Sequence, residues 1–158
     1  MLMAPAPPPL PPHEVAAVTV MAPTEPPKLV ASYPAEGQAV APGVLILKLT
    51  FDQRMTATGF DIAPAPGAEA LACVKTPRLL NDGKTFVLLC TGLSARSYVL
   101  ALNAQPEGGF RNLGENRAIP VTLSFTTTSG EPVRSLSQAM RVQKLSELDV
   151  PVQESPTR

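Results

Sequence analysis

Between residues 28 and 128 the chain consists of short runs in which apolar and polar positions alternate. In one run Leu45, Leu47, Leu49 and Phe51 are apolar, whereas the residues between them include Lys48 and Thr50. A repeat of two residues is typical of a strand with one buried face. The same alternation predicts strands at 86–90, 98–102 and 121–125, and weaker patterns predict strands at 29–33, 60–62 and 71–75.

Turn-forming residues separate these runs. Clusters of Pro, Gly, Asn and Asp occupy positions 34–37, 41–43, 66–67, 81–84 and 107–109. A parallel sheet would need crossover helices between its strands, and no long helical pattern lies between these runs. The sequence therefore predicts an all-β domain at 28–128, an antiparallel β-sandwich of about seven strands.

The N-terminal 27 residues have a different composition, since they contain nine of the 19 prolines. Proline fixes φ and lacks a backbone donor, which favours polyproline II or disorder over helix or paired strand. We therefore expect residues 1–27 to be a disordered proline-rich tail or spacer. The spacing of Pro8 and Pro11 also fits a PxxP ligand, so a recognised motif is the alternative.

The polar C-terminal residues 129–158 are predicted to form a tail with a short helix. Ser135 and Gln138 have the spacing of a capping box, and Leu136, Met140 and Leu148 form a loose apolar stripe. These features predict a helix at 135–145, which either packs on its own domain or docks to a partner.

Charge and targeting patterns exclude several classes of partner. Thirteen basic residues balance thirteen acidic residues, so bulk electrostatics does not favour nucleic acid or an anionic membrane. No apolar run approaches the roughly 18 residues of a membrane span. The first six residues carry no Lys or Arg, and prolines interrupt each apolar stretch near the start, so no signal peptide is visible in this chain.

Three segments of the predicted domain resemble bacterial Ig-like domains of surface-layer and other exported proteins. They are Leu29–Gly37, with its Pro-x-x-Gly turn, Leu49–Asp52, which ends in Phe-Asp, and the Phe-x-Thr strand at Leu123–Thr127. The resemblance implies an Ig-like Greek-key topology and a structural or protein-interaction role in the cell envelope. It marks as structural the residues Pro34, Gly37, Phe51, Tyr98 and Phe125; Tyr98 also fits a tyrosine corner.

The segment Leu29–Phe51 also resembles the periplasmic copper-binding sandwich domains of copper resistance. Soft-metal sites need several imidazole, thiolate or thioether ligands. Here His13 is the only histidine and lies in the proline tract, and Met55 is the only methionine of the predicted domain. The resemblance thus stops at the scaffold, and a periplasmic ligand- or metal-binding protein is the alternative function.

The two cysteines, Cys73 and Cys90, lie on either side of the turn Asn81–Lys84. Folding back at this turn brings them nearly opposite each other, with an offset of about two residues that a bulge at Pro77 would absorb. A disulfide here would require an oxidising compartment, which indicates a periplasmic or secreted protein. The alternative is two buried thiols that act as small hydrophobic side chains.

No motif for catalysis is present, and we expect neither an enzyme nor a cofactor. The chain lacks a nucleophile elbow, a phosphate-binding glycine loop and a His-Glu-x-x-His helix. Asp52 and Asp61 are conceivable as a carboxylate pair, but Asp52 follows a strand, where turn capping is more common. Asn112 stands where the Ig-like family often has Asp. Whether Asp52, Met55 and Asn112 meet in a pocket or point into solvent distinguishes the two functions.

Overall fold

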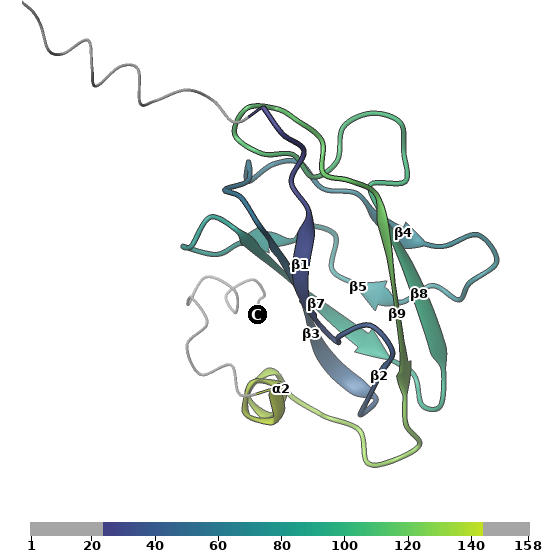
Figure 1. Cartoon of the computed structure of the whole chain (residues 1–158). Helices are drawn as coiled ribbons and strands as arrows, with labels where there is room; N and C mark the ends of the chain where they lie inside the picture. Colours follow the sequence, from purple (N-terminus) through teal and green to yellow (C-terminus); the bar gives the residue numbers. More distant parts are fainter. Residues whose placement is uncertain (1–23, 144–158) are drawn as a thin grey trace, which may run out of the picture.

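The computed structural model describes residues 24–143, which form two face-to-face β-sheets and one short helix (Figure 1). Most of the predicted proline-rich tail, with Pro8, Pro11 and His13, lies outside the described residues, as does Leu148. No helix in this part of the chain is long and apolar enough to cross a membrane.

One sheet has five strands and the other has four. The five-stranded sheet has the order β1 (Leu29–Tyr33), β3 (Gly43–Phe51), β7 (Thr85–Gly92) and β5 (Ala72–Cys73), and β6 (Arg78–Leu79) also pairs with β7. The four-stranded sheet has the order β2 (Gln38–Val40), β9 (Val121–Thr127), β8 (Ser97–Leu102) and β4 (Ile62–Pro64). This is the strand order of an immunoglobulin-type sandwich, so the predicted fold class is confirmed.

All seven predicted strands are present, with ends that differ by a few residues. The two strands that were not predicted, β2 and β6, have only three and two residues. Strand β2 pairs with β9 in parallel, which is an exception to the antiparallel prediction.

The parallel pair exists because the first strand moves from one sheet to the other. β1 pairs with β3, and the turn after Tyr33 then carries the chain across to β9. The Tyr33–Pro34 peptide bond is cis, and Gly37 has a φ of 79°, a conformation that favours glycine. The Gly37 N–H donates to the Ser124 carbonyl at 2.7 Å, which fixes the start of β2 on β9.

The core lies between the sheets and follows the predicted alternation. Leu45, Leu47, Leu49 and Phe51 of β3 are at most 3 % exposed and belong to one apolar cluster. Within this cluster the aromatic rings of Phe51, Phe86 and Phe110 contact one another in edge-to-face or tilted arrangements, with centroids 4.9–6.2 Å apart. Such contacts add stability beyond the buried area alone.

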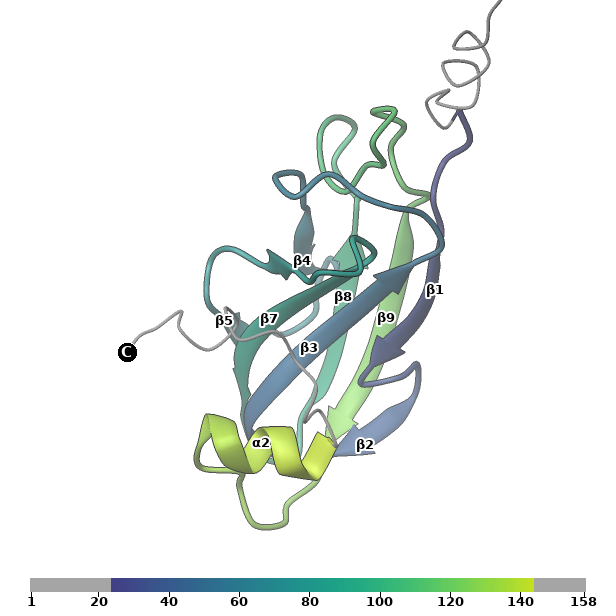
Figure 2. The same cartoon turned by 90° about the vertical axis from the view of Figure 1, so that its left-hand side faces the viewer.

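The outer face of the five-stranded sheet is also partly covered, because the helix α2 (Leu136–Gln143) lies against it (Figure 2). Ile46 of β3 and Val87 of β7 are buried there, beside Leu136 and Met140 of the helix. Gln138 N–H donates to the Ser135 hydroxyl at 3.1 Å, and the Gln138 side chain accepts from the Arg134 N–H. The predicted capping residues therefore begin the helix, which packs on its own domain.

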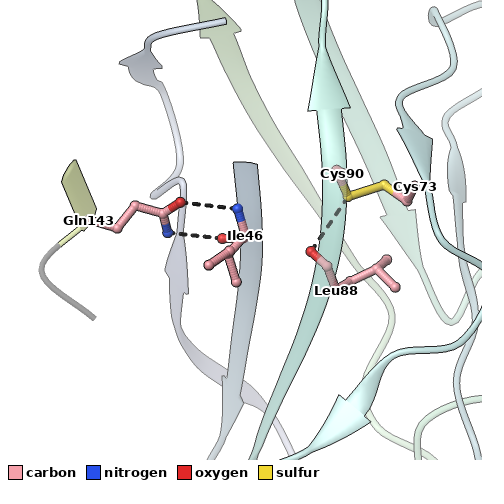
Figure 3. Close-up of a disulfide and its surroundings, with 5 residues drawn as sticks. All are labelled: Ile46, Cys73, Leu88, Cys90 and Gln143. Atoms are coloured by element: carbon pink, nitrogen blue, oxygen red, sulfur yellow. Dashed lines mark hydrogen bonds between the residues drawn. A yellow bond between two sulfur atoms is a disulfide. The ribbon is translucent and has the colours of Figure 1, made fainter. Parts of the chain in front are cut away.

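Strand β1 pairs with only the second half of β3. The rest of that edge is covered by the segment before α2 and by the last residue of the helix. Val44 N–H donates to the Val133 carbonyl, and Val133 N–H donates to the Pro42 carbonyl. Farther along, the Gln143 side chain accepts from the Ile46 N–H and donates to the Ile46 carbonyl, both at 3.0 Å (Figure 3). The carboxamide thus takes the place of a paired strand, which protects an edge that would otherwise be open to other chains.

Candidate functional site

The most distinctive chemical feature of the domain is a disulfide between Cys73 of β5 and Cys90 of β7 (Figure 3). The two residues are directly opposite each other in the antiparallel ladder, with their Cα atoms 3.9 Å apart. Cys90 is 2 % exposed and Cys73 is half-buried, so the bridge joins the core to an edge strand. The described residues contain no free cysteine.

The chain between the cysteines contains the offset that the sequence predicted. Arg78 pairs with Val87 on β7, whereas Cys73 pairs with Cys90. Five residues of one side therefore face three residues of the other, so two extra residues bulge out between β5 and β6. Pro77, which lacks a backbone donor, lies in this interruption and is buried.

The residues marked as structural by the family resemblance are buried or lie at a turn. Phe51, Tyr98 and Phe125 are at most 2 % exposed, and Pro34 and Gly37 form the turn between β1 and β2. The Tyr98 hydroxyl accepts a hydrogen bond from the Leu93 N–H at 2.9 Å. This bond to the backbone five residues upstream is the geometry of a tyrosine corner.

Met55 and Asn112 meet at one end of the sandwich, but not as an open ligand set. They form an isolated bridge between two loops, and both are at most 2 % exposed. Met55 belongs to the core cluster, and its N–H donates to the Gly83 carbonyl at 2.7 Å. Asp52 lies apart from these buried positions, on the exposed surface, where it accepts the Lys28 N–H at 2.9 Å.

The Asn112 side chain uses both of its polar atoms inside the protein. Its Oδ1 accepts from the Gly114 N–H, the Asn116 N–H and the Asn116 side chain at 2.9–3.2 Å. Its Nδ2 donates to the Glu25 carbonyl and the Gln53 side chain at 3.0 and 2.8 Å. An aspartate could not make the two donated bonds, which gives a structural reason for asparagine at this position.

A second buried asparagine, Asn103, organises the long loop between β8 and β9. Its Oδ1 accepts from the Phe110 N–H at 2.7 Å, and its Nδ2 donates to the Phe110 and Ala118 carbonyls at 3.0 Å. Asn103 has a φ of 60°, a left-handed conformation that asparagine tolerates. A Cβ on Gly109 would lie 2.2 Å from the Asn103 Oδ1, so glycine is required there. Asn103 was not predicted as a functional residue from the sequence; its position just after a strand was the available signal.

The candidate carboxylates serve separate structural roles. Asp61 accepts the Gln105 N–H at 2.9 Å, whereas Asp52 accepts the Lys28 N–H, so the two carboxylates bind different segments of the backbone. Asp82 accepts from the Lys84 and Thr85 N–H groups and from the Thr85 hydroxyl at 2.7–2.9 Å. Partial burial raises the pKa of Asp82, but these hydrogen bonds and the Lys84 charge outweigh it, so the pKa is below its usual value.

The described residues hold no group of three or more His, Cys, Asp or Glu side chains that could bind a metal ion. The two cysteines are joined to each other, and Met55 is enclosed in the core. In the part of the chain that the structure describes, the polar side chains of the loops stabilise the loops themselves.

The architecture defines a β-sandwich with immunoglobulin-type strand order, stabilised by one disulfide. No model of a known protein family matches the chain, and no curated protein matches it. Among solved structures, the S-layer protein rSbsC is similar over 75 % of this chain and 15 % of its own, with 16 % identity and a TM-score of 0.45. CopC from Methylosinus trichosporium OB3b is similar over 66 % of this chain and 96 % of its own, with 19 % identity and a TM-score of 0.47.

Proposed function

We propose that this chain is a non-catalytic β-sandwich module of the bacterial cell envelope, with a structural or protein-binding role. The observation that carries the proposal is the Cys73–Cys90 disulfide within the folded domain. Disulfides form and persist in the periplasm and outside the cell, whereas cytosolic thiols are kept reduced. The proposal therefore includes a location outside the cytoplasm.

The loop residues support a role without catalysis. Catalytic groups need a substrate within hydrogen-bond reach and polar atoms that are free to contact it. Here the side chains of Asn103 and Asn112 are buried and bonded to the backbone, and Asp52 and Asp61 accept backbone N–H groups of different segments. These side chains are used to hold the loops in place.

Two surfaces could make the contact with a protein partner, namely the exposed sheet edge at β1 and the loops at the end of the sandwich. Val30 of β1 is 59 % exposed at the sheet edge, and Leu113 is 54 % exposed in the loop that follows β8. Large apolar side chains on an edge strand or a loop tip are common elements of protein interfaces.

The oxidation state in the native cell tests the location. Cells are quenched in acid, free thiols are alkylated, and the intact mass of the protein is measured before and after reduction. We expect no alkyl group before reduction and two after it, because the chain has two cysteines. Two alkyl groups before reduction would show a reduced protein and contradict an envelope location.

Photo-crosslinking tests the protein-binding role and separates the two surfaces. A photoreactive amino acid is placed at Val30 in one variant and at Leu113 in another. The two positions are similarly exposed, so each variant controls for nonspecific crosslinking in the other. A protein adduct at only one position would assign the contact to the sheet edge or to the loops. The absence of adducts at both positions in intact cells would argue against a protein-binding role.

A further inference from the structure

A cavity of about 250 Å³ opens between the two sheets at the edge formed by β4 and β5. Its innermost residues are Leu88 of β7 and Leu100 of β8, which come from facing sheets and are 6 % and 3 % exposed. The cavity exists because both edge strands are short: β4 has three residues and β5 has two. Neither strand is long enough to close the gap between the sheets.

Apolar side chains make up most of the cavity wall. Phe60, Ile62 and Leu71 line it, and each is only partly buried against the core although it belongs to the same apolar cluster. The disulfide residue Cys73 also lines it, so the bridge to β7 holds one wall in place. Val74, at 46 % exposure, adds apolar surface at the opening.

One positively charged side chain lines the cavity. Lys75 is the single charged residue that lines the cavity, and it is exposed. Among the described residues no carboxylate forms a salt bridge with Lys75. The following strand β6 adds another exposed basic residue, Arg78, at the same sheet edge. An apolar wall below an unpaired ammonium group is complementary to a molecule with an apolar body and an anionic head.

We propose that this cavity binds a small carboxylate amphiphile, with its apolar part between Leu88 and Leu100 and its carboxylate near Lys75. The volume sets the size of the ligand. An apolar cavity of about 150 Å³ holds a benzene ring, and pockets for drug-sized ligands begin at about 300 Å³. The cavity therefore fits a medium-chain acyl group or a short aryl-alkyl chain. This inference does not depend on the proposed envelope role.

The test uses two probes with equal chain length and opposite charge, octanoate and octylammonium, added to the oxidised protein. Binding is followed by the NMR shifts of backbone amides and methyl groups. We expect octanoate to shift the signals of Ile62, Leu71 and Leu100 in a saturable manner, with an affinity on the order of millimolar for a ligand of this size. Octylammonium should bind more weakly.

Two charge-reversal variants test the role of Lys75. Lys75→Glu should weaken octanoate binding by about two- to fivefold, as expected for an exposed charge pair. Lys28→Glu is the matched control, because Lys28 precedes β1 at the opposite edge of the same sheet and the net charge changes equally. The control should leave the affinity unchanged. Shifts that do not saturate, that centre on Val30 and Val121, or that are equally strong with octylammonium would overturn the proposal.

Discussion

Removing the Cys73–Cys90 disulfide should destabilise the domain substantially, by an amount that follows from the length of the closed loop. The cysteines are 17 residues apart in the sequence. In the chain-entropy model, closing a loop of this length lowers the entropy of the unfolded chain and thereby raises the free energy of unfolding by about 3 kcal/mol. A typical domain is stable by only about 5–15 kcal/mol, so the bridge supplies a large share of the total.

The location of the bridge indicates how the reduced protein would respond. Strand β5 is an edge strand of two residues, Ala72 and Cys73, and its neighbour in the sheet is β7. Two ladder residues without a covalent bridge give weak protection against local opening. We therefore expect amide hydrogen exchange to increase first in β5 and in the bulge before β6, ahead of the central strands β3 and β7.

The assay compares urea and thermal unfolding of the oxidised protein, the reduced protein and the Cys73→Ala/Cys90→Ala variant. Reduction should lower the free energy of unfolding by about 3 kcal/mol and the midpoint temperature by about 10–15 °C for a domain of this size. The double variant should resemble the reduced protein, and its stability should not change when reductant is added. A loss below about 0.5 kcal/mol on reduction would contradict this prediction, because the loop would then be ordered without the bridge.

Three further changes test the polar contacts of the fold. Asn103→Ala should lower the free energy of unfolding in urea by at least about 3 kcal/mol, because it leaves three buried backbone groups unpaired. Asn103→Gly should lower it less, since glycine adopts the left-handed φ without strain. Equal losses in the two variants would assign the whole effect to the lost hydrogen bonds. Gln143→Ala should cost about 1–2 kcal/mol by freeing the Ile46 backbone, and Gln143→Glu should recover little, because a carboxylate accepts from the N–H but repels the carbonyl. Asp82→Asn should be less stable than the wild type at neutral pH, and the difference should shrink as the pH falls below 3.8, because the hydrogen bonds that lower the pKa of Asp82 stabilise only the ionised carboxylate. A difference that stays constant as the pH is lowered through the acidic range would rule out this linkage.

The family resemblance and the strand pattern differed in what they could establish. The period-two pattern at 45–51 correctly placed four side chains in the core, because burial of one face is a local property of a strand. The hairpin register around Asn81–Lys84 likewise placed Cys73 opposite Cys90 with a bulge near Pro77. The family resemblance marked Tyr98, and the structure shows its hydroxyl bonded to the Leu93 N–H. The functions that the family resemblance implies stay proposals, because core and turn residues indicate the fold and not the activity.

Local patterns in the sequence were enough to predict the class of fold, the strands of its core, the start of the helix and the spacing of the cysteines, because each of these depends on residues that are near one another in the chain. Which sheet edges are covered and which stay open became clear only from the folded structure. The bonds of Gln143 to Ile46 join residues 97 positions apart, and the hydrogen bond from Asn112 to the Glu25 carbonyl spans 87. The cavity beside Lys75 is lined by residues of four strands, β4, β5, β7 and β8, and of the loops next to β4 and β5. Periodicity records which face of a strand is buried, but not which distant segment covers it.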